Sequence, residues 1–582
     1  MVTVNVTHDI VLNGVGYLTV DRGLRMTPQP PFVARVNEGP LTHRAGDQWD
    51  VITYADWSHG LGQEGADEEA GDLAMFMDSH GIETSIPGQL TLATKVVLSD
   101  NSFIARALCD GGNRYVFAGG DTSIRYGDFT VEPGVWANAV TGLAAGVTDL
   151  AEYKGKLYAA LGTGQDMRVC DAPATAPTTW TTLTGIKRTL LKVWKDKLWA
   201  ASGNSLYSFD GATWGSALVC GDSSIPITGL VEYGNLLVVF KEDRVMLCDG
   251  TNIVEAGVTY SRYAKNGQRP ALWGGYIWLP QQANVKRLSG LGVAPAETDL
   301  SPVYPYSIYA SIPSFTYGWG LPVAMAVGPK NLFVMFELTS GSGMTVLKRN
   351  DFGWHAVWQN AGSAYALYYS QVADRLFIND GSTRFQRYLS NGSPYPDYDT
   401  VLPGELRLSW DTARFNEIPK AWRSITLDMV NTNLTRYVKM RYVTQRWPGG
   451  IATDLPGLFT SPPQQEVLFS GSAAAISANW VRLNLQMYTD NAAQTPVVNA
   501  ITVKRLLRPP KLFVVTADVR IADNLMQLDK TLDPNTATDL KSALLTAANS
   551  VTPITLQTPD GLTHEGYLEE ITFEETIKRE GA

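Results

Sequence analysis

Side chains that act as catalysts or metal ligands are thinly spread in this sequence. Its 582 residues include six histidines, and no two of them stand three to five residues apart, as zinc ligands usually do. The six are His8, His43, His59, His80, His355 and His564. The four cysteines form no Cys-x-x-Cys pair, which favours buried free thiols over disulfides or metal ligands. We therefore predict no metal site and no cofactor.

Acidic residues also fail to form a recognisable catalytic or calcium motif. The tract near Glu64 and the aspartates Asp529, Asp533 and Asp539 lack the alternating oxygen ligands and the glycine of a dedicated calcium loop. The sequence has no Gly-x-Ser-x-Gly elbow and no phosphate-binding Gly-Lys-Ser/Thr loop. Glycosidases need two carboxylates that face each other across the substrate, which a linear sequence does not reveal. We predict that the chain is not an enzyme, and we name no catalytic residues.

One acidic turn nevertheless has a known counterpart. The segment Ser208–Trp214 resembles the aspartate-box turn of sialidases, although it is one residue shorter. In those enzymes the turn is structural and lies away from the reaction centre. The resemblance therefore implies a propeller, and a propeller hydrolase or lyase that acts on polysaccharide stays open as an alternative function.

A dense group of aromatic residues stands between positions 304 and 319. Six aromatic residues fall within sixteen positions, namely Tyr304, Tyr306, Tyr309, Phe315, Tyr317 and Trp319. Flat amphipathic side chains lose little entropy on binding, so we predict contact with a partner protein or a host-surface receptor. Stacking on sugar rings and packing inside the protein, between two repeated units, remain alternatives.

One short phrase recurs seven times and indicates how the chain is built. Each copy has a polar, turn-forming pair, then Leu or Tyr, then a short apolar or aromatic run. The first apolar residue stands at position 115, 157, 198, 236, 276, 332 or 376, at intervals of 42, 41, 38, 40, 56 and 44, and the aromatic group lies in the longest interval. A period of about 40 residues with strands in each unit is typical of propeller blades. We predict a mainly β protein with a seven-bladed β-propeller over residues 97–400.

Each repeated unit also contains the pieces of a four-stranded sheet. A second apolar run precedes the phrase, as in 149–153 and 189–194. The Gly, Asp and Asn residues between the two runs suit a tight hairpin, because they tolerate positive φ. A third run often ends in Asp-Gly, as in 206–211 and 245–250, and a fourth often carries tryptophan.

The rest of the chain lacks this period. Residues 1–96 mix short extended pieces with proline, glycine and acidic residues, and we predict an N-terminal extended arm that serves assembly. Residues 401–508 alternate apolar and polar side chains, which favours a C-terminal β-sandwich. Residues 509–582 combine strand and helix patterns and indicate a small α+β terminal domain.

The predicted helix of the terminal domain has clear boundaries. Asp533 and Pro534 are suited to a helix start, since proline is tolerated at the first helical position. Leu540, Leu544 and Leu545 then fall on one predicted face. The helix is expected to end at Asn549.

Charge and hydropathy exclude two classes of partner. Lysine and arginine total 47 against 57 acidic residues, which gives a net charge of −10 without a long basic run. Binding to nucleic acid phosphates needs a concentrated basic surface, so we predict no nucleic-acid partner. The sequence also lacks a run of about 18 apolar residues and a basic segment followed by an apolar stretch at its start, so we predict no membrane insertion and no secretion signal.

Three segments resemble parts of tailed-bacteriophage virion proteins. Ala55–Gln63 resembles a Trp-Ser-x-Gly-x-Gly-Gln phrase near the start of phage minor tail proteins that continue into a propeller, with His59 where glycine is more common. The phrases 481–485 and 495–503 are similar to the strand pair that precedes the C-terminal module of such proteins.

The resemblance implies a structural virion protein of the minor tail or tail-tip type. It implies virion assembly beside other tail or baseplate proteins, synthesis in the host cytoplasm, and localisation in the virion. Tails impose threefold or sixfold order, so a homo-oligomer of that symmetry is expected. Host attachment, through a propeller that recognises a host-surface glycan or protein, remains an alternative function.

Overall fold

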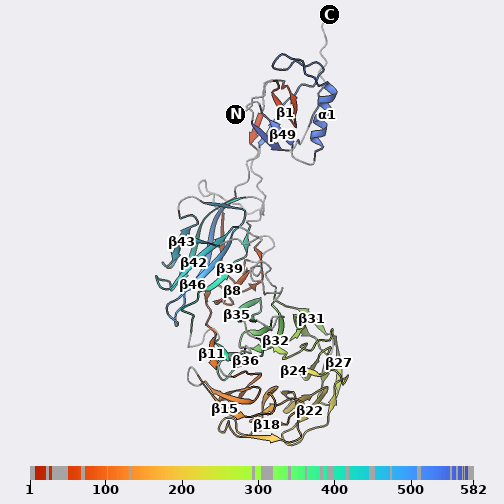
Figure 1. Ribbon diagram of the computed structural model, residues 1–582, viewed down its shortest axis with the longest axis vertical. Coiled ribbons are helices and arrows are strands. Elements are labelled where there is room, and N and C mark those ends of the chain that lie inside the picture. The colour runs from red at the N-terminus through yellow and green to blue at the C-terminus, as the bar shows by residue number, and fades with distance from the viewer. Residues whose placement is uncertain are drawn as a thin grey trace. The chain divides into compact units, whose positions relative to one another are not determined.

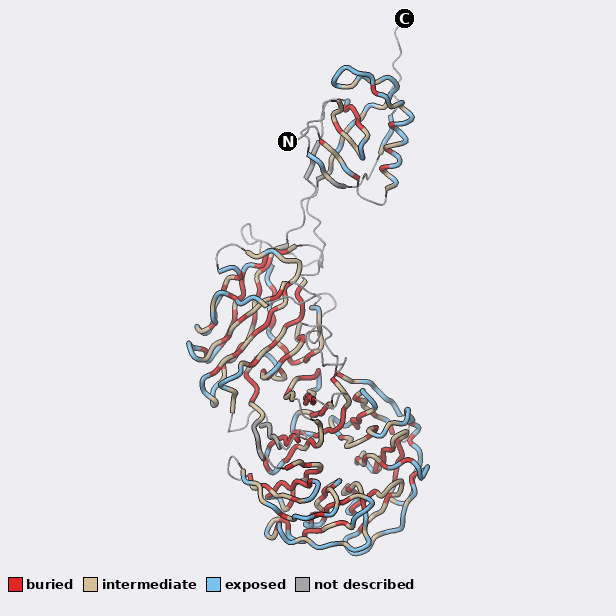
Figure 2. Tube along the Cα trace, viewed as in Figure 1, coloured by how far each residue is buried: buried red, intermediate tan, exposed pale blue. Residues whose placement is uncertain are grey.

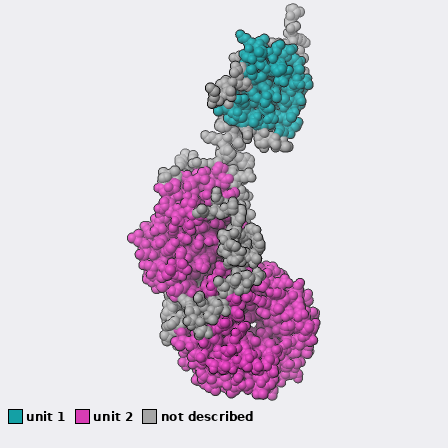
Figure 3. All heavy atoms as spheres, in the orientation of Figure 1, with its two compact units in different colours: residues 1–42, 509–582 teal, residues 43–508 magenta. Residues whose placement is uncertain are grey.

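The protein is described by a computed structural model in which strands predominate over a single described helix (Figure 1). The structure describes residues 7–20, 25–28, 50–66, 73–100, 103–129, 134–291, 295–302, 319–337, 343–360, 363–379, 385–389, 397–412, 419–444, 452–471, 475–507, 513–550, 554–558, 562–566, 568 and 571–574. The chain divides into two compact units, which Figure 3 colours separately. Unit 1 comprises residues 1–42 and 509–582, and unit 2 comprises residues 43–508.

The repeated part of unit 2 forms seven antiparallel sheets of four described strands each. The first contains β12 (Ala107–Gly111), β13 (Tyr115–Gly119), β14 (Ser123–Asp128) and β15 (Val135–Thr141). The second contains β16 (Asp149–Tyr153), β17 (Lys156–Ala160), β18 (Met167–Cys170) and β19 (Trp180–Leu183). The third contains β20 (Leu190–Trp194), β21 (Lys197–Ser202), β22 (Ser205–Phe209) and β23 (Leu218–Val219).

The next three sheets have the same order along the chain. They are β24 (Ile227–Tyr233), β25 (Leu236–Lys241), β26 (Arg244–Cys248) and β27 (Ile253–Thr259); β28 (Ala271–Trp273), β29 (Tyr276–Gln281), β30 (Asn284–Ser289) and β31 (Ala296–Asp299); and β32 (Leu321–Val327), β33 (Leu332–Glu337), β34 (Met344–Arg349) and β35 (Trp354–Asn360). The seventh sheet joins β36 (Ala366–Ser370), β37 (Arg375–Asn379) and β38 (Phe385–Leu389) to β11 (Val97–Asp100).

These sheets are arranged one after another in a closed circle. The first strand of each sheet packs against the first strand of the next, from β12 through β16, β20, β24, β28 and β32 to β36. Strand β36 then packs against β12, which returns the order to its start. Strand β11, from the beginning of this region, pairs with β38 from its end. The arrangement is β-propeller-like. In each of the seven sequence phrases, the first apolar residue lies within one residue of the start of the second strand of a sheet.

Two turns show why the Asp-Gly phrases recur. The Asp210 carboxylate accepts hydrogen bonds from the backbone N–H groups of Ala212 and Thr213, each at 2.7 Å. Asp249 accepts in the same way from Thr251 and Asn252, at 2.8 and 2.7 Å. Aspartate side chains mimic a backbone turn in this way, so both residues join the third strand of a sheet to its fourth.

The rest of unit 2 contains two larger sheets. The first has the order β43 (Thr453–Phe459), β42 (Tyr437–Val443), β46 (Arg482–Tyr488), β39 (Gly404–Arg407) and β8 (Asp78–His80). The second has the order β44 (Gln464–Leu468), β41 (Lys420–Val430), β47 (Val497–Leu507), β10 (Leu90–Leu92) and β9 (Ile82–Glu83), with β4 (Asp50–Tyr54) on β47 and β45 (Ile476–Ala478) on β41. Two short parallel pairs join β5 (Gly60–Leu61) to β7 (Met75–Phe76) and β6 (Gly65–Ala66) to β40 (Trp410–Asp411).

One apolar core runs through these two sheets and into the ring. It contains buried residues of the segment 52–92, of the sheets β28–β31 and β32–β35, and of both larger sheets. Trp57, Trp354 and Trp422, one from each of these parts, belong to it. Figure 2 shows the buried stretches inside unit 2 in red. A core shared in this way makes the ring and the two larger sheets parts of one packed body.

Unit 1 is built from both ends of the chain. Its main sheet has the order β2 (Val15–Tyr17), β1 (Ile10–Leu12), β49 (Ile554–Gln557) and β50 (Thr563–Gly566), and a second pair joins β3 (Arg25–Pro28) to β48 (Phe513–Thr516). Ile10 and Tyr17 share a small core with Leu540 and Leu544 of the helix α1 (Ala537–Ala548). The residues near the start of the chain therefore complete the terminal α+β unit.

This division differs from the predicted boundaries. Residues 1–96, predicted as one extended arm, are shared between the two units, because β1 pairs with β49 while β4 and β10 pair with β47. The helix also starts later than predicted. Thr536 caps it, and the Asp539 side chain accepts a reciprocal bond from the Thr536 backbone N–H, which completes a capping box. Leu545, predicted on the buried face, is 43% exposed.

Candidate functional site

The predicted aromatic contact group falls mostly outside the described residues. Tyr304, Tyr306, Tyr309, Phe315 and Tyr317 lie outside them. Trp319 is described, and only 7% of its surface is exposed within the large core of unit 2. For this one residue, the structure therefore favours the internal-packing alternative over contact with a partner or glycan.

The segment that carries the virion resemblance is anchored on the ring. The Asp56 carboxylate accepts hydrogen bonds from the backbone N–H groups of Trp57 and Ser58 and from the Ser58 hydroxyl, at 2.7, 3.0 and 3.0 Å. This turn directs the Trp57 side chain, which has no exposed surface, into the core. The Asn350 side chain donates to the Ser58 carbonyl at 2.9 Å, which ties the turn to the hairpin between β34 and β35.

Glycine is required on both sides of this contact. Gly60 has a φ of +92°, and a Cβ there would lie 2.6 Å from the backbone nitrogen of Trp354. A Cβ on Gly353 would overlap the carbonyl oxygen of His59. The two backbones thus touch directly, and the His59 ring stacks on Phe352 with centroids 5.0 Å apart. The glycine at position 60 of the phrase is therefore explained by the close approach of two backbones.

A buried ion pair lies beside this contact. Glu83 and Lys348 are paired, and their side chains are 0% and 5% exposed. Next to them, the Thr84 hydroxyl lies 2.7 Å from Nδ1 of His355, which is also fully buried. Burial, and then the nearby Lys348 ammonium, lower the pKa of His355 to about 3. His355 is therefore neutral. The Glu83–Lys348 ion pair and the neutral His355 imidazole together are called the buried joint below.

A second polar cluster occupies the middle of the ring. The Arg269 guanidinium, from the residues just before β28, donates to the carbonyl of Arg106, just before β12. These two strands belong to sheets that are not neighbours in the circle, so the side chain reaches across the ring. Arg106 is in turn paired with Asp121, whose side chain is half exposed.

Asp149 adds an acidic group to this ring cluster. It is the first residue of β16, and its carboxylate accepts from the N–H groups of Leu150 and Leu191 at 2.9 and 2.7 Å. Burial raises its pKa to about 6, although these bonds and the Arg269 charge oppose the change. Burial also lowers the pKa of Arg269, with Asp149 acting in the opposite direction. In this cluster Asp149 and Arg269 are bonded to backbone groups, and Arg106 is paired with Asp121.

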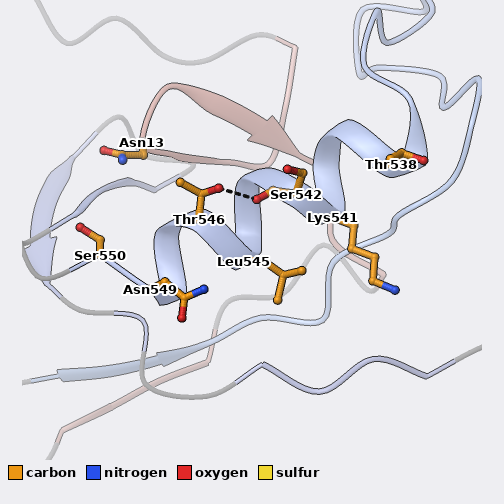
Figure 4. Close-up of a pocket in the computed structure, with 8 residues that line it drawn as sticks. All are labelled: Asn13, Thr538, Lys541, Ser542, Leu545, Thr546, Asn549 and Ser550. Carbon is orange, nitrogen blue, oxygen red and sulfur yellow. Dashed lines mark hydrogen bonds between the residues drawn. The ribbon is translucent and has the colours of Figure 1, made fainter.

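One open surface depression lies in unit 1. It runs along α1 and is lined by Asn13, Thr538, Lys541, Ser542, Leu545, Thr546, Asn549 and Ser550 (Figure 4). The Thr546 hydroxyl within it donates to the Ser542 carbonyl at 2.8 Å. Among the described residues, no group of three or more His, Cys, Asp or Glu side chains is placed to hold a metal ion. No helix of the described parts is long and apolar enough to cross a bilayer.

Sequence reasoning did not identify the ring cluster or the buried joint. Arg106, Asp149 and Arg269 stand in different repeated units, and nothing in their local spacing sets them apart. A signal in the sequence is present only for the backbone contact next to the joint. Both Gly60 and Gly353 adjoin a phrase that contains tryptophan, and glycine suits a position where two backbones approach closely.

Comparisons with known proteins identify no family for this chain. No family model matches it, and no curated protein matches it. Solved structures similar to it include a mitotic checkpoint complex, at 13% identity and a TM-score of 0.39, covering 51% of this chain and 95% of that one. The computationally designed Ika8 protein is similar at 12% identity and a TM-score of 0.36, covering 51% and 100%.

A catalytically inactive virginiamycin B lyase from Staphylococcus aureus, crystallised with quinupristin, is also similar. Its identity is 9% and its TM-score 0.38, and the match covers 51% of this chain and 99% of that one. Similarities this weak carry no argument about activity or ligands. The description of the fold rests on the strand pairing.

Proposed function

We propose that this chain is a structural subunit of a tailed-bacteriophage virion, placed in the tail or tail tip. In this proposal the seven sheets of unit 2 are the blades of a seven-bladed β-propeller, and the two larger sheets are a β-sandwich fused to it. The circular packing order of the first strands supports the blade count. The anchored phrase around Trp57 supports the virion assignment, because it carries the sequence resemblance.

The single observation that carries the proposal is the core shared by the ring and the sandwich. Its buried side chains come from the segment 52–92, from two sheets of the ring and from both sandwich sheets. Separating these parts would expose that apolar surface, at a cost of about 25 cal/mol for each Å². The two bodies are therefore held at a fixed angle. A subunit fixed between unlike neighbours needs separate faces with a constant relation to one another.

Partners and symmetry are consequences of the same role. The subunit would pack against other virion proteins of the tail or baseplate, and copies of the chain would form a ring of threefold or sixfold symmetry. The net charge of −10 is compatible with partners that are proteins and not nucleic acid. Light scattering of the purified full chain measures the number of copies directly.

Purified particles provide the decisive test. We expect mass spectrometry of density-purified virions to find the chain in a fixed ratio to the capsid protein, and immunogold labelling to place it at the tail. Absence from purified virions would refute the proposal. Labelling at the capsid surface would retain a virion protein and reject the tail position.

A competition experiment separates this role from host attachment. Purified full-length protein is added to host cells before infection, and free phage is counted after adsorption. A connector inside the tail should leave adsorption unchanged. Protein that binds the cells and blocks adsorption would favour the receptor-binding alternative.

A further inference from the structure

A hairpin in unit 1 is fixed by backbone hydrogen bonds. The N–H of Gln527 donates to the Thr531 carbonyl at 2.8 Å. The N–H of Asp533 donates to the Leu525 carbonyl at 2.7 Å, which closes the base of the hairpin. The Leu525 side chain packs against the small core of unit 1. The hairpin 525–533 is therefore ordered, and its base is attached to the rest of the unit.

The outer face of this hairpin is apolar. Met526 and Leu532 lie opposite each other across it, and each is 63% exposed. Leu528, near the tip, is 39% exposed. Successive side chains of an extended segment point to opposite faces, so Met526 points away from the core that receives Leu525. Extended segments that face water usually carry polar side chains there, and an ordered apolar group in that position indicates a contact surface.

The hairpin does not fill the depression along α1 in its own copy. The N–H of Leu528 donates to the Thr7 carbonyl at 3.0 Å, and the Asp523 carboxylate accepts from the N–H of Ala537, the first residue of α1, at 2.8 Å. These bonds hold the hairpin near the start of the helix. The depression continues past the other end to Ser550, and α1 is about 18 Å long at a rise of 1.5 Å for each of its 12 residues. None of the described residues that line the depression belongs to the hairpin.

The depression is complementary to the hairpin in size and charge. Its volume is about 730 Å³, within the range of about 300–1,000 Å³ that is typical of sites that receive a ligand. Leu545, 43% exposed, gives it an apolar surface, and of the described residues that line it only Lys541 is charged (Figure 4). Residues 523–533 contain three aspartates and one lysine, a net charge of −2. Hydrogen bonds from Thr531 lower the pKa of Asp529 at the hairpin tip, so its carboxylate is negatively charged.

We propose that the hairpin 525–533 of one copy of this chain binds in the α1 depression of a second copy. In this contact Met526 and Leu532 pack on Leu545, and the Asp529 carboxylate approaches the Lys541 ammonium. Apolar burial supplies the affinity, and the charge pair at the edge fixes the orientation.

The contact joins two different surfaces of unit 1 and is therefore head-to-tail. Each pair of copies keeps one free hairpin and one free depression, so further copies add in the same way. Such contacts close into a ring when the rotation between copies fits, and otherwise extend into a filament. The contact deepens the proposed function, and only the expected closure at three or six copies rests on that function. The two surfaces themselves belong to unit 1 alone.

Analytical ultracentrifugation of the full chain tests this contact. We expect the unaltered chain to associate. The double variant Met526→Asp with Leu532→Asp removes the apolar pair, and Ser542→Trp fills the depression from an exposed position. Each change should raise the dissociation constant at least about tenfold, since both remove the centre of the contact. The matched control is Leu434→Asp, because Leu434 is 83% exposed in unit 2 and should not affect association.

A mixture of the two defective variants distinguishes a head-to-tail contact from a symmetric one. The Ser542→Trp variant keeps an intact hairpin, and the hairpin variant keeps an intact depression. An equimolar mixture should therefore form a dimer through one intact contact, and nothing larger. A symmetric contact would not be restored by mixing, so a mixture that stays monomeric would overturn the proposal.

Exchange of the two charges tests the orientation. Asp529→Lys and Lys541→Asp should each weaken association, and the two together should restore it. Circular dichroism confirms that every variant is folded. A full chain that stays monomeric at about 0.1 mM, or one whose association neither defective variant changes, would overturn the contact. A monomeric chain that is nevertheless present in purified virions would reject this contact alone, whereas a chain that associates as described but is absent from virions would reject the proposed function alone.

Discussion

Glu83 and Lys348 form an ion pair that is almost completely withdrawn from water, although 265 residues separate them in sequence. Glu83 belongs to β9, and Lys348 belongs to β34 in the ring. The pair therefore links the segment before the ring to one of its sheets. Burial acts to raise the pKa of Glu83, but Lys348 and the bonds from Ser85 outweigh it, and the pKa lies below its usual range.

Removing one partner of this pair should destabilise unit 2 severely. Lys348→Met leaves the Glu83 carboxylate buried without its cation, and we expect a loss of about 3–5 kcal/mol in the free energy of unfolding. Urea denaturation followed by fluorescence measures this loss. Lys156→Met is the control, because Lys156 and Asp171 are about half exposed and such pairs contribute only about 0–1 kcal/mol. Equal effects of the two substitutions would contradict the structural importance of the buried pair.

The backbone contact around His59 predicts a strong effect of a single methyl group. Gly353→Ala places a Cβ against the His59 carbonyl, and we expect a loss of about 1–3 kcal/mol from overpacking. Gly164→Ala is matched to it, because a Cβ at Gly164 meets no atom within 4 Å and its φ is not positive. The control should be neutral or stabilising by up to about 1 kcal/mol. Thermal unfolding of the two variants decides the matter, and an unaffected Gly353→Ala would show that the contact does not form.

Asp149 and His355 should make the free energy of unfolding depend on pH in opposite directions. The folded pKa of Asp149 is about 6, above the value of about 3.9 in an unfolded chain. The folded state therefore holds the proton more tightly, and its contribution is present below about pH 3.9 and lost as the pH rises through about 6. Asp149→Asn keeps an acceptor for Leu150 and Leu191 and should remove this loss. The measurement is the unfolding free energy from about pH 4 to about pH 7, and an unchanged slope would refute the shift.

His355 acts in the other direction. Its folded pKa of about 3 lies below the unfolded value of about 6.5, so the unfolded state takes up a proton first as the pH falls. Stability is then lost progressively between about pH 6.5 and about pH 3. His355→Gln retains an acceptor for the Thr84 hydroxyl and cannot be protonated in this range. We expect its unfolding free energy to fall less steeply over that interval than in the unaltered chain, and a parallel fall would count against a buried neutral imidazole.

The composition of unit 1 predicts which fragments fold. Residues 509–582 alone lack β1 and the buried side chains of Ile10 and Tyr17, so we expect no cooperative unfolding from them. Residues 43–508 contain the whole of unit 2 and should unfold as they do in the full chain. Adding a peptide of residues 1–42 to the C-terminal fragment should restore the helical signal in circular dichroism. A C-terminal fragment that is folded by itself would contradict the shared unit.

The sequence predicted the repeated sheets because their determinants are local. A turn-forming pair before residues such as Leu198 or Leu376, followed by an apolar run, specifies a hairpin over about ten residues. The turns at Asp210 and Asp249 are equally local. The helix start was misplaced by a few residues because Thr536 and Asp539 form a better cap than Asp533.

Pairing over long separations could not be predicted in the same way. Val11 lies opposite Gln557, and Ile52 lies opposite Val503, yet neither strand carries a mark of its distant partner. Without those pairings, residues 1–96 have the composition of an arm. The same limit applies to Arg106, Asp149 and Arg269, which approach one another only because the ring closes. Trp319 shows a further limit, since an aromatic side chain suited to binding is equally suited to a core.

Closure of the ring sets an order of events during synthesis. Val97 of β11 lies opposite Arg387 of β38, so the sheet that closes the ring uses strands from both ends of this region. While the ribosome is still translating the residues between them, β11 lacks its partner β38, and the ring of sheets remains open. In unit 1, β1 likewise gains its partner β49 only after the chain has been made as far as Gln557. Growth of the polypeptide and completion of its native structure are therefore separated in time, and a truncated product would expose unpaired strand edges to its neighbours.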